Sequence, residues 1–528
     1  MYKLLLTTAL VLLLVSCRDS QDELDNPSSE NYLLSSLSVS EGVLEPAFSP
    51  DTHEYTVDLT TDTTSLSIYA SSEEGLSVSI DGTISGSKVI TLYPEENTVD
   101  VIVTSEDGEN TSEYSININC ARYLREPERY QLDTSMQQKF GLVCENSNGD
   151  KVSISSMVDT LYAMHYIDGS GFGQLVEIGS LLYNESDFDA VIDSDGNILV
   201  VYAHRASNSS PEIFYVAYKP GTGWSSPTLL SPSGENTNSF QLILDENETP
   251  IISLYTSNKV LSSVFSFSSG WSTLVEVDSN NGVYSNLQLI QAGDKYYIFW
   301  QNLNNINPVV GAQGIYYSVR TEGGQWSNPI QLYNKTIVNF GLNADGNSQG
   351  EICITFTESS STVSGSKVVA IYYRESYGWG TPVEISNSVV GGGRAELGID
   401  ETGNVLIAYI GDGLDQDTWT NRYMAGVGWS GPSLTLSGGA TDHVVTSIAD
   451  YTFILVFNQY IPSIPSLLYY SIFNIYNGWE EFKTLGESHY YFTAFNHISK
   501  VANGDTAIVF AGKEYSSSMI LLHHRWYK

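Results

Sequence analysis

The stretch GWSSP occupies residues 223–227, and variants of it return along the second half of the chain: GWSTL (270–274), QWSNP (325–329), GWGTP (378–382), GWSGP (428–432) and GWEEF (478–482). Counted through Phe172, Trp224, Trp271, Trp326, Trp379, Trp429 and Trp479, the steps are 52, 47, 55, 53, 50 and 50 residues. A period of this length indicates a repeated structural unit, and it takes precedence over any local interpretation of the chain.

The repeat in residues 188–230 shows how the unit is built. It contains the apolar runs FDAVI (188–192), ILVVY (198–202) and IFYVAY (213–218), followed by GWSSP and a last short run. Four short antiparallel strands in a step of this size are typical of a β-propeller blade. The sequence therefore predicts an all-β chain with a propeller over residues 122–528.

The number of blades follows from the first strand of each unit. These strands are predicted to begin near residues 140, 188, 240, 287, 340, 395, 444 and 495, which gives eight blades, with seven as the alternative if one unit is irregular. The last unit lacks a fourth strand of its own. We predict that residues 130–133 supply it, because joining both ends of the chain in one blade removes the open edges.

Two recurring turns have a structural explanation. Gly suits the tight turn before each Trp, and Trp is large enough to pack between adjacent blades, so we interpret the Trp series as packing and not as sugar platforms. The second turn, Asp-x-x-Gly-Asn at 193–197 and 400–404, supplies a residue with positive φ between the first two strands. A calcium loop is the alternative, but no Glu stands eleven residues after Asp193. No metal site is predicted.

The first 17 residues have the form of a secretory signal. One Lys precedes an apolar run from Leu4 to Val15, which is short for a bilayer span, and small Ser16 and Cys17 follow. This ending resembles a bacterial lipobox, which implies that Cys17 carries a lipid anchor; an ordinary signal peptide is the alternative.

Residues 18–33 are polar and acidic, which predicts a flexible tether. An acidic stretch directly after the lipid-bearing Cys also resembles the surface-export signal of Bacteroidetes lipoproteins. We therefore expect an outer-membrane lipoprotein, exposed on the cell surface and joined to the membrane only through its anchor.

Residues 34–121 alternate with a period of two, as in TVDVIV at 98–103 and YSINI at 114–118. This pattern predicts a small antiparallel β-sandwich. The stretch LSSLSVSEGVLEPAFSPDTHEYTVDL (34–59) and the later VIVTSEDGENTSEYSININ (101–119) resemble the cadherin-like β-sandwich domains of bacterial surface proteins. The resemblance implies a spacer or adhesion module that holds the propeller away from the membrane.

Composition excludes one class of partner. The chain has 23 Lys and Arg against 61 Asp and Glu, a formal charge of −38, so it would repel nucleic acid. Besides Cys17 there are three cysteines. Cys120 and Cys144 are free to pair in an oxidising compartment, whereas Cys353 lies in an apolar run and is expected to be a buried thiol.

A binding site is expected where the variable loops gather, at the end of the blades opposite the repeated turns. The long connections between second and third strands, and those between blades, bring amide, carboxylate, cationic and aromatic side chains to this rim. Such groups suit a neutral or cationic carbohydrate. The candidate residues are His204, Arg205, Gln301, Asn302, Glu358, Asp412, Asp415, Trp419, Gln459, Tyr460, Arg394 and His443.

The repeats also resemble sialidase-type propellers and propeller lectins with Gly-Trp-Ser-x-Pro repeats. This resemblance implies either glycan binding or, as the alternative, a glycoside hydrolase or polysaccharide lyase acting on extracellular glycans. The family's carboxylate clamp needs three arginines, and only Arg205, Arg394 and Arg422 are expected at the loop rim, in nearly opposite blades. We therefore favour a protein that binds a glycan or a surface protein, with no catalytic residue assigned and no cofactor.

Overall fold

The computed structural model describes residues 32–59, 65–92, 95–120, 128–131, 138–146, 148, 150–157, 159–167, 171–181, 188–205, 211–232, 235–279, 283–303, 313–321, 323–335, 337, 341–359, 366–386, 392–411, 416–438, 440–459, 467–484, 490–491, 497–500, 506–514 and 519–526. None of these residues lies in a helix, which confirms the predicted all-β class. In this part of the chain, no helix long and apolar enough to cross a membrane is found. The chain divides into two compact units, Met1–Ala121 and Arg122–Lys528.

The first unit is built from two sheets. A three-stranded sheet has the order β1-β4-β7, and a six-stranded sheet has the order β2-β3-β9-β8-β5-β6. The strands are β1 (Leu34–Val39), β2 (Leu44–Glu45), β3 (Glu54–Leu59), β4 (Ser65–Ser72), β5 (Ser77–Ile80), β6 (Thr83–Ile84), β7 (Ser87–Thr91), β8 (Glu95–Thr104) and β9 (Thr111–Cys120). All described pairs are antiparallel except β3 with β9, which run parallel.

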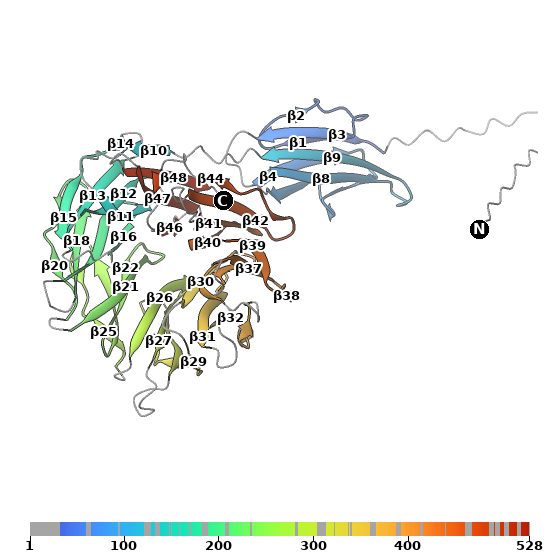
Figure 1. The fold of residues 1–528 in the computed structure, drawn as a ribbon. Helices are drawn as coiled ribbons and strands as arrows, with labels where there is room; N and C mark the ends of the chain where they lie inside the picture. The colour runs from blue at the N-terminus through green and yellow to red at the C-terminus, as the bar shows by residue number, and fades with distance from the viewer. Residues whose placement is uncertain are drawn as a thin grey trace, which may run out of the picture. The chain divides into compact units, whose positions relative to one another are not determined.

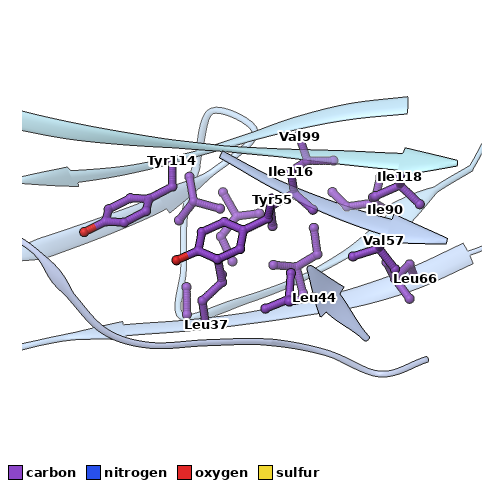
Figure 2. Close-up of a cluster of buried hydrophobic side chains, with 14 of the residues drawn as sticks. Leu37, Leu44, Tyr55, Val57, Leu66, Ile90, Val99, Tyr114, Ile116 and Ile118 are labelled. Atoms are coloured by element: carbon purple, nitrogen blue, oxygen red, sulfur yellow. The ribbon is translucent and has the colours of Figure 1, made fainter. Parts of the chain in front are cut away.

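The period-two pattern places one face of each strand in a shared core, shown in Figure 2. Strand β3 alternates between exposed and buried residues along its whole length, so that Tyr55 and Val57 face the core. The two buried tyrosines keep their hydroxyl groups paired. Tyr114 Oη accepts from the amide of Leu34 at 3.0 Å and donates to the carbonyl of Pro50 at 2.8 Å, so this polar group adds no desolvation penalty.

The described residues of the second unit form eight sheets in chain order (Figure 1). The first four comprise β11 (Gln138–Glu145), β12 (Lys151–Met157), β13 (Thr160–Ile167), β14 (Gly171–Phe172), β15 (Val176–Ser180); β16 (Phe188–Ile192), β17 (Ile198–His204), β18 (Glu212–Lys219), β19 (Gly223–Trp224), β20 (Thr228–Leu229); β21 (Thr237–Leu244), β22 (Pro250–Thr256), β23 (Val260–Ser266), β24 (Gly270–Trp271), β25 (Val275–Asp278); and β26 (Tyr284–Ala292), β27 (Lys295–Asn302), β28 (Gly314–Thr321), β29 (Ile330–Tyr333).

The remaining sheets follow the same plan. They comprise β30 (Asn343–Gly346), β31 (Ile352–Ser359), β32 (Ser366–Arg374), β33 (Gly378–Trp379), β34 (Val383–Glu384); β35 (Gly393–Ile399), β36 (Val405–Ile410), β37 (Thr418–Met424), β38 (Gly428–Trp429), β39 (Ser433–Leu436); β40 (Ala440–Ala449), β41 (Thr452–Gln459), β42 (Leu467–Asn474), β43 (Gly478–Trp479), β44 (Lys483–Thr484); and β45 (Tyr490–Tyr491), β46 (His497–Lys500), β47 (Thr506–Glu514), β48 (Met519–Trp526), with β10 (Glu128–Gln131) added.

Strand β10 pairs antiparallel with β48, so that Tyr130 lies opposite Leu521 and Gln131 opposite Ile520. This confirms that the segment ahead of the first sheet joins the last sheet in the place of a fourth strand. Residues 132 and 133 of the predicted strand lie outside the described residues.

Successive sheets lie along a curved path in Figure 1, and their first strands are neighbours from β11 to β40. A side chain of one first strand bonds a backbone amide of the next. Asp189 accepts from Leu242 N at 2.9 Å, Gln241 from Leu289 N at 2.5 Å, and Asp345 from Ile399 N at 3.2 Å. The same linkage thus recurs at the period of the sequence repeat.

Apolar side chains join the sheets farther from these strands. One buried cluster combines Leu199, Val201 and Ile213 of one sheet with Leu242 and Ile252 of the next. Other clusters likewise span two successive sheets. The core of this unit is therefore distributed between neighbouring sheets.

The Gly-Trp stretches form the first part of the fourth strand. Trp224, Trp271, Trp379, Trp429 and Trp479 each lie opposite an aromatic residue of the third strand, and the preceding Gly has positive φ in every case. Trp271 also contacts Tyr215 of its preceding sheet, with ring centroids 6.0 Å apart. Trp379 likewise contacts Tyr317 of the sheet before its own, with centroids 5.5 Å apart. The packing role predicted for the tryptophans is confirmed at these two positions.

The Ser after Trp closes the gap in the fourth strand. Ser225 donates its amide to the carbonyl of Ala217 at 2.8 Å, and its hydroxyl accepts from the Ala217 amide at 3.0 Å. Ser272 and Ser327 do the same for Val264 and Val319. A hydroxyl thereby takes the place of a backbone carbonyl where the strand is interrupted.

Of the two cysteines that the sequence left free to pair, Cys144 has a described side chain. Cys144 is a free, buried thiol whose Sγ donates to the carbonyl of Ala190 in the next sheet at 2.9 Å. Burial raises the pKa of this thiol, and the nearby Asp189 adds to the effect. Cys353 is also a free, buried thiol, as predicted.

Candidate functional site

Each sheet of the second unit has two different ends. At the turn end, the first strand turns into the second and the third into the fourth. At the loop end, the second strand leads into the third, and the chain passes from one sheet to the next.

The recurring turns at the turn end satisfy their own polar groups. Asp193 accepts from the amide and the side chain of Asn197, at 2.7 and 2.8 Å, and Asp400 makes the same two bonds with Asn404. Asn347 accepts instead from the amides of Gln349 and Glu351. These are Asx turns, in which the side chain bonds the backbone a few residues ahead. No group of three or more potential metal ligands occurs among the described residues.

These turns are also joined to each other. Asn146 Nδ2 donates to the carbonyl of Asp193 at 2.9 Å, and Asn347 Nδ2 donates to that of Asp400 at 2.9 Å. The hydroxyl of Ser194 bonds Glu248 of the next sheet. The recurring turns therefore hold neighbouring sheets together, and their donors and acceptors are used within the protein.

The candidate residues of the loop end differ in exposure. Arg394 is exposed and His204, Arg205, Glu358 and Trp419 are partly exposed, whereas Gln301, Asn302 and His443 are buried. Asp412, Asp415 and Tyr460 lie outside the described residues, and Gln459 ends strand β41 without a described side chain. Trp419 lies within strand β37 and not in the loop before it.

Arg422 is not at the loop end, which corrects its expected position. It lies near the end of β37 opposite Leu406, and its guanidinium donates to the carbonyl of Ile475 in the next sheet. Its place in the third strand could be predicted from the sequence. This strand runs from the loop end to the turn end, and Arg422 lies near its last residue, beside the turn. The three expected arginines are therefore not together.

A backbone irregularity recurs in the first strands near the loop end. The register shifts lie between Gln138 and Phe140, Thr237 and Ser239, Ser285 and Leu287, Gly393 and Glu396, and Ala440 and Asp442. Bulges of this kind turn a side chain away from the regular alternation, and they occur often beside binding sites. Sequence reasoning missed them, because one extra residue in a strand leaves no local signal.

Two bulge residues other than Gly have a left-handed backbone. The φ angles are 45° at Asn286 and 49° at Arg394, a conformation that costs a residue with a Cβ about 1–2 kcal/mol. Gly392 and Gly393 precede Arg394 but do not take this conformation. The strain therefore falls on the residue with the long cationic side chain.

The Asn286 bulge meets Gln301 of the second strand. Asn286 Nδ2 donates to Gln301 Oε1 at 2.6 Å, and Ser285 Oγ donates to the same oxygen at 3.3 Å. The whole Gln301 residue is 0% exposed, and its buried amide nitrogen has no hydrogen-bond partner. A buried donor without a partner costs about 1–3 kcal/mol, so its retention calls for a reason.

Thr357 has a similar environment in the following sheet. Its hydroxyl is buried without a partner, and it faces Gly341, where an added Cβ would lie 2.9 Å from Oγ1. The same Cβ would lie 3.6 Å from the amide nitrogen of Arg394. Gly341 thus permits a close approach between this hydroxyl and the Arg394 bulge.

Arg394 also acts on His443 in the next sheet. Burial lowers the pKa of His443 to about 4; the hydrogen bond between Nε2 and the Ala408 carbonyl raises it, and the charge of Arg394 lowers it. His443 is therefore a neutral side chain at ordinary pH. Of the candidate residues with described side chains, Arg394 and His443 are one pair that the structure brings together.

Glu358 is held by neighbours of its own. Tyr333 donates to Glu358 Oε2, and Lys335 Nζ lies 3.6 Å from Oε1. Burial, followed by the bond with Glu358, raises the pKa of Tyr333, so this phenol stays protonated. Glu358 is the one carboxylate among the candidate residues whose side chain is described, so the described residues provide no catalytic carboxylate pair among the candidates.

Comparison with known proteins addresses the two units separately. Residues 34–120 match the family model of the cadherin-like β-sandwich domain, which confirms the resemblance predicted for this region. That match covers the first unit alone. Among curated proteins, none matches the chain.

Several solved structures resemble the chain loosely. The BP39L lectin from Burkholderia pseudomallei is 11% identical, with 66% of this chain and 100% of the lectin covered and a TM-score of 0.47. An ulvan lyase of a polysaccharide lyase family is 12% identical, with 68% and 96% covered and a TM-score of 0.42. The Hadza microbial sialidase Hz136 is 12% identical, with 71% and 75% covered and a TM-score of 0.33. At these scores the likeness assigns no activity to this chain.

Proposed function

We propose that the second unit is a closed eight-bladed β-propeller that binds a carbohydrate at its loop end. The closed ring is supported by the neighbouring first strands of β11 to β40 and by β10, which occupies the outer place in the sheet of β48. A seven-bladed ring would require one of the eight sheets to lie outside it.

The observation that carries the binding proposal is the contrast between the ends. The Asx turns bond their own polar side chains, whereas the loop end keeps the Gln301 amide nitrogen and the Thr357 hydroxyl buried without partners. Near the turn end, the buried groups without partners include the ring nitrogens of Trp271 and Trp379, which lie in the packing between strands. Amide and hydroxyl groups with free capacity are what sugar hydroxyls require, and a sugar reaches these two buried groups only when the side chains that cover them move. The bulges at Asn286 and Arg394 lie beside them.

A glycan array tests this proposal with the full chain in detergent. We expect binding to a defined glycan class, weakened at least tenfold by Gln301→Leu, because this change keeps the volume but removes the amide. Gln349→Ala is the matched control, since Gln349 is exposed at the turn end. Absence of binding by the native chain, or equal effects of both variants, would contradict the proposal.

The same samples separate binding from catalysis. Incubation of the bound glycan with the native chain should leave its length unchanged. Cleavage that is lost on replacement of one carboxylate would establish the hydrolase or lyase alternative instead.

The proposed position on the cell surface depends on residues 1–33, of which residues 1–31 lie outside the described part of the chain. Labelling of cells with a clickable fatty acid should mark the native chain but not Cys17→Ser. Protease treatment of intact cells should then remove the labelled protein, if it is exposed. Label on both chains would contradict the anchor at Cys17.

A further inference from the structure

Three exposed apolar residues lie on the turns between third and fourth strands of consecutive sheets. Tyr377, Val427 and Tyr476 are 84%, 79% and 65% exposed, which makes them the most exposed large apolar residues described in the second unit. They belong to the turns β32–β33, β37–β38 and β42–β43. We call these three residues the turn row.

The turn itself does not require apolar residues. The position two residues before Trp holds Tyr377 and Val427, but Thr222, Ser269 and Gly324 in the three preceding sheets. At all five positions, the amide donates to the carbonyl three residues earlier. All five turns therefore share the same backbone geometry, and folding of the turn does not require an apolar side chain at this position.

Contacts between third strands place the three turns beside each other. The rings of Tyr372 and Tyr423 stack with centroids 4.6 Å apart, just before the turns that carry Tyr377 and Val427. In the next pair of sheets, Arg422 lies over the ring of Phe473, 6.0 Å from its centroid, and it bonds the carbonyl of Ile475. Tyr476 follows directly, so the turn row spans three adjoining sheets.

Tyr476 is fixed in its exposed position. Its ring contacts that of Tyr451 on the neighbouring first turn, with centroids 5.3 Å apart, and its amide donates to Asn474 Oδ1 at 3.0 Å. An ordered, exposed aromatic ring loses little conformational entropy on binding. Exposed apolar groups on adjoining turns are candidates for an interaction site, and Tyr is among the residues enriched at such sites.

The charge around the turn row selects the partner. The turn segments of these three sheets, residues 345–351, 374–377, 400–404, 424–427, 450–451 and 474–481, contain eight acidic residues and one basic residue, a formal charge of −7. The basic residue, Arg374, is paired with Glu351 at 3.0 Å. Two lysines outside these segments also pair with them, Lys295 with Glu375 at 2.5 Å and Lys483 with Glu480 at 3.5 Å, and with both lysines counted the formal charge is −5. A second copy of the chain, or an anionic membrane, would meet charge of the same sign.

We propose that the turn row is a docking surface for a basic protein, whose apolar centre covers Tyr377, Val427 and Tyr476 and whose Lys and Arg residues face the surrounding carboxylates. A neutral glycan would stack on the tyrosines, but it would gain nothing from Val427 or from the acidic surroundings. This surface is at the opposite end of the sheets from the proposed carbohydrate site, so the two proposals stand or fall separately.

Site-specific photo-crosslinking in the source cells tests the surface. The probe is p-benzoylphenylalanine, placed in the full chain at position 377, 427 or 476, with positions 222 and 269 as matched controls on equivalent turns. We expect one and the same protein to be joined at the three row positions, with a yield about tenfold above the controls. Equal yields at the controls, no protein adduct, an adduct with a second copy or an adduct with a polysaccharide would each overturn the proposal.

The crosslinked protein is then purified and its affinity for the full chain is measured. We expect Tyr377→Ser with Val427→Ser to raise Kd at least tenfold, and added salt to raise it as well, because screening weakens attraction between opposite charges. Thr222→Ala is the control that should leave Kd unchanged. A Kd indifferent to the double substitution, or one that falls as salt is added, would overturn the proposal. Serine occurs naturally at the equivalent turn position, as Ser269, so the double variant is expected to fold. Equal unfolding midpoints of the native chain, the double variant and Thr222→Ala verify this.

Discussion

The carboxylate of Asp193 accepts two hydrogen bonds from Asn197, one from its backbone amide at 2.7 Å and one from its side-chain amide at 2.8 Å. Asp400 and Asn404 repeat this relationship four sheets later. The acidic residue that begins the recurring turn is thus occupied by its own backbone, and it stabilises the path from the first strand to the second.

Loss of this carboxylate should destabilise the second unit. Because Asp193→Ala removes an acceptor from two donors, we expect the free energy of unfolding to fall by about 1–3 kcal/mol. Asp195→Ala in the same turn is the matched control, since Asp195 is exposed and should change stability by less than about 0.5 kcal/mol. Urea unfolding followed by tryptophan fluorescence measures both. Similar losses for the two variants would contradict the assigned role.

Trp379 should be required for stability and not for binding. Its ring contacts Tyr373 at 5.0 Å, Tyr317 at 5.5 Å and Phe299 at 5.9 Å, which includes two rings of the preceding sheet. We expect Trp379→Ala to cost about 3 kcal/mol, at the lower end of the range because the residue is half-buried. Trp379→Phe should retain most of this stability. If the alanine variant unfolds at the native urea midpoint, the packing role is wrong.

His443 should make stability depend on pH. Its pKa falls from 6.5 in the unfolded chain to about 4 in the folded protein. Between pH 6.5 and 4, His443 is protonated in the unfolded chain but stays neutral in the folded chain. The contribution of His443 to the free energy of unfolding is therefore fully present above pH 6.5, and the free energy of unfolding decreases as the pH falls toward 4, by up to about 3 kcal/mol.

The control for this dependence is His443→Gln, which cannot titrate. Unfolding midpoints of the native chain and the variant, measured from pH 7.5 to 4.5, should converge as the pH falls. Parallel curves over this interval would show that His443 titrates alike in both states.

The left-handed backbone at Arg394 gives a prediction that does not depend on its side chain. Arg394→Gly and Arg394→Ala both remove the guanidinium, but only Gly relieves the strain, so the glycine variant should be more stable by about 1 kcal/mol. Gly393→Ala is a control at an adjacent position, where an added Cβ meets nothing within 4 Å. Equal stability of the two Arg394 variants would mean that the bulge relaxes once the side chain is removed.

Cys144 and Cys353 should resist alkylation in the folded protein. Burial raises the pKa of both thiols, which removes the reactive thiolate and also blocks access. Iodoacetamide treatment followed by mass spectrometry should leave these positions unmodified until denaturant is added. Modification of Cys144 in the native chain would contradict its buried position.

The sequence predicted the features of the fold that depend on periodicity. Gly-Trp at about 50-residue steps correctly located the third turn of five sheets, and the pattern at 188–218 correctly located the first three strands of the second sheet. These signals are local, because a tight turn demands Gly and a sheet core demands alternation.

The structure of the loop end could be predicted less well from the sequence. Gln301 and Asn302 were assigned to an exposed rim because they are polar and follow an apolar strand, yet both are buried within the last residues of β27. The buried Gln301 is bonded by Asn286 of the bulge, which supplies a partner to its side-chain oxygen. A bulge is set by pairing with another strand, so no single stretch of sequence reveals it.

The interruption of the fourth strand has a consequence for the protein in concentrated solution. Its two pieces, such as β19 and β20, are only two residues each, and Ser225 between them turns a hydroxyl toward Ala217. A long row of unpaired amides and carbonyls would recruit strands from other molecules, whereas such short segments provide a poor template. The same serine that completes one sheet therefore helps a chain so rich in strands to avoid amyloid-like growth.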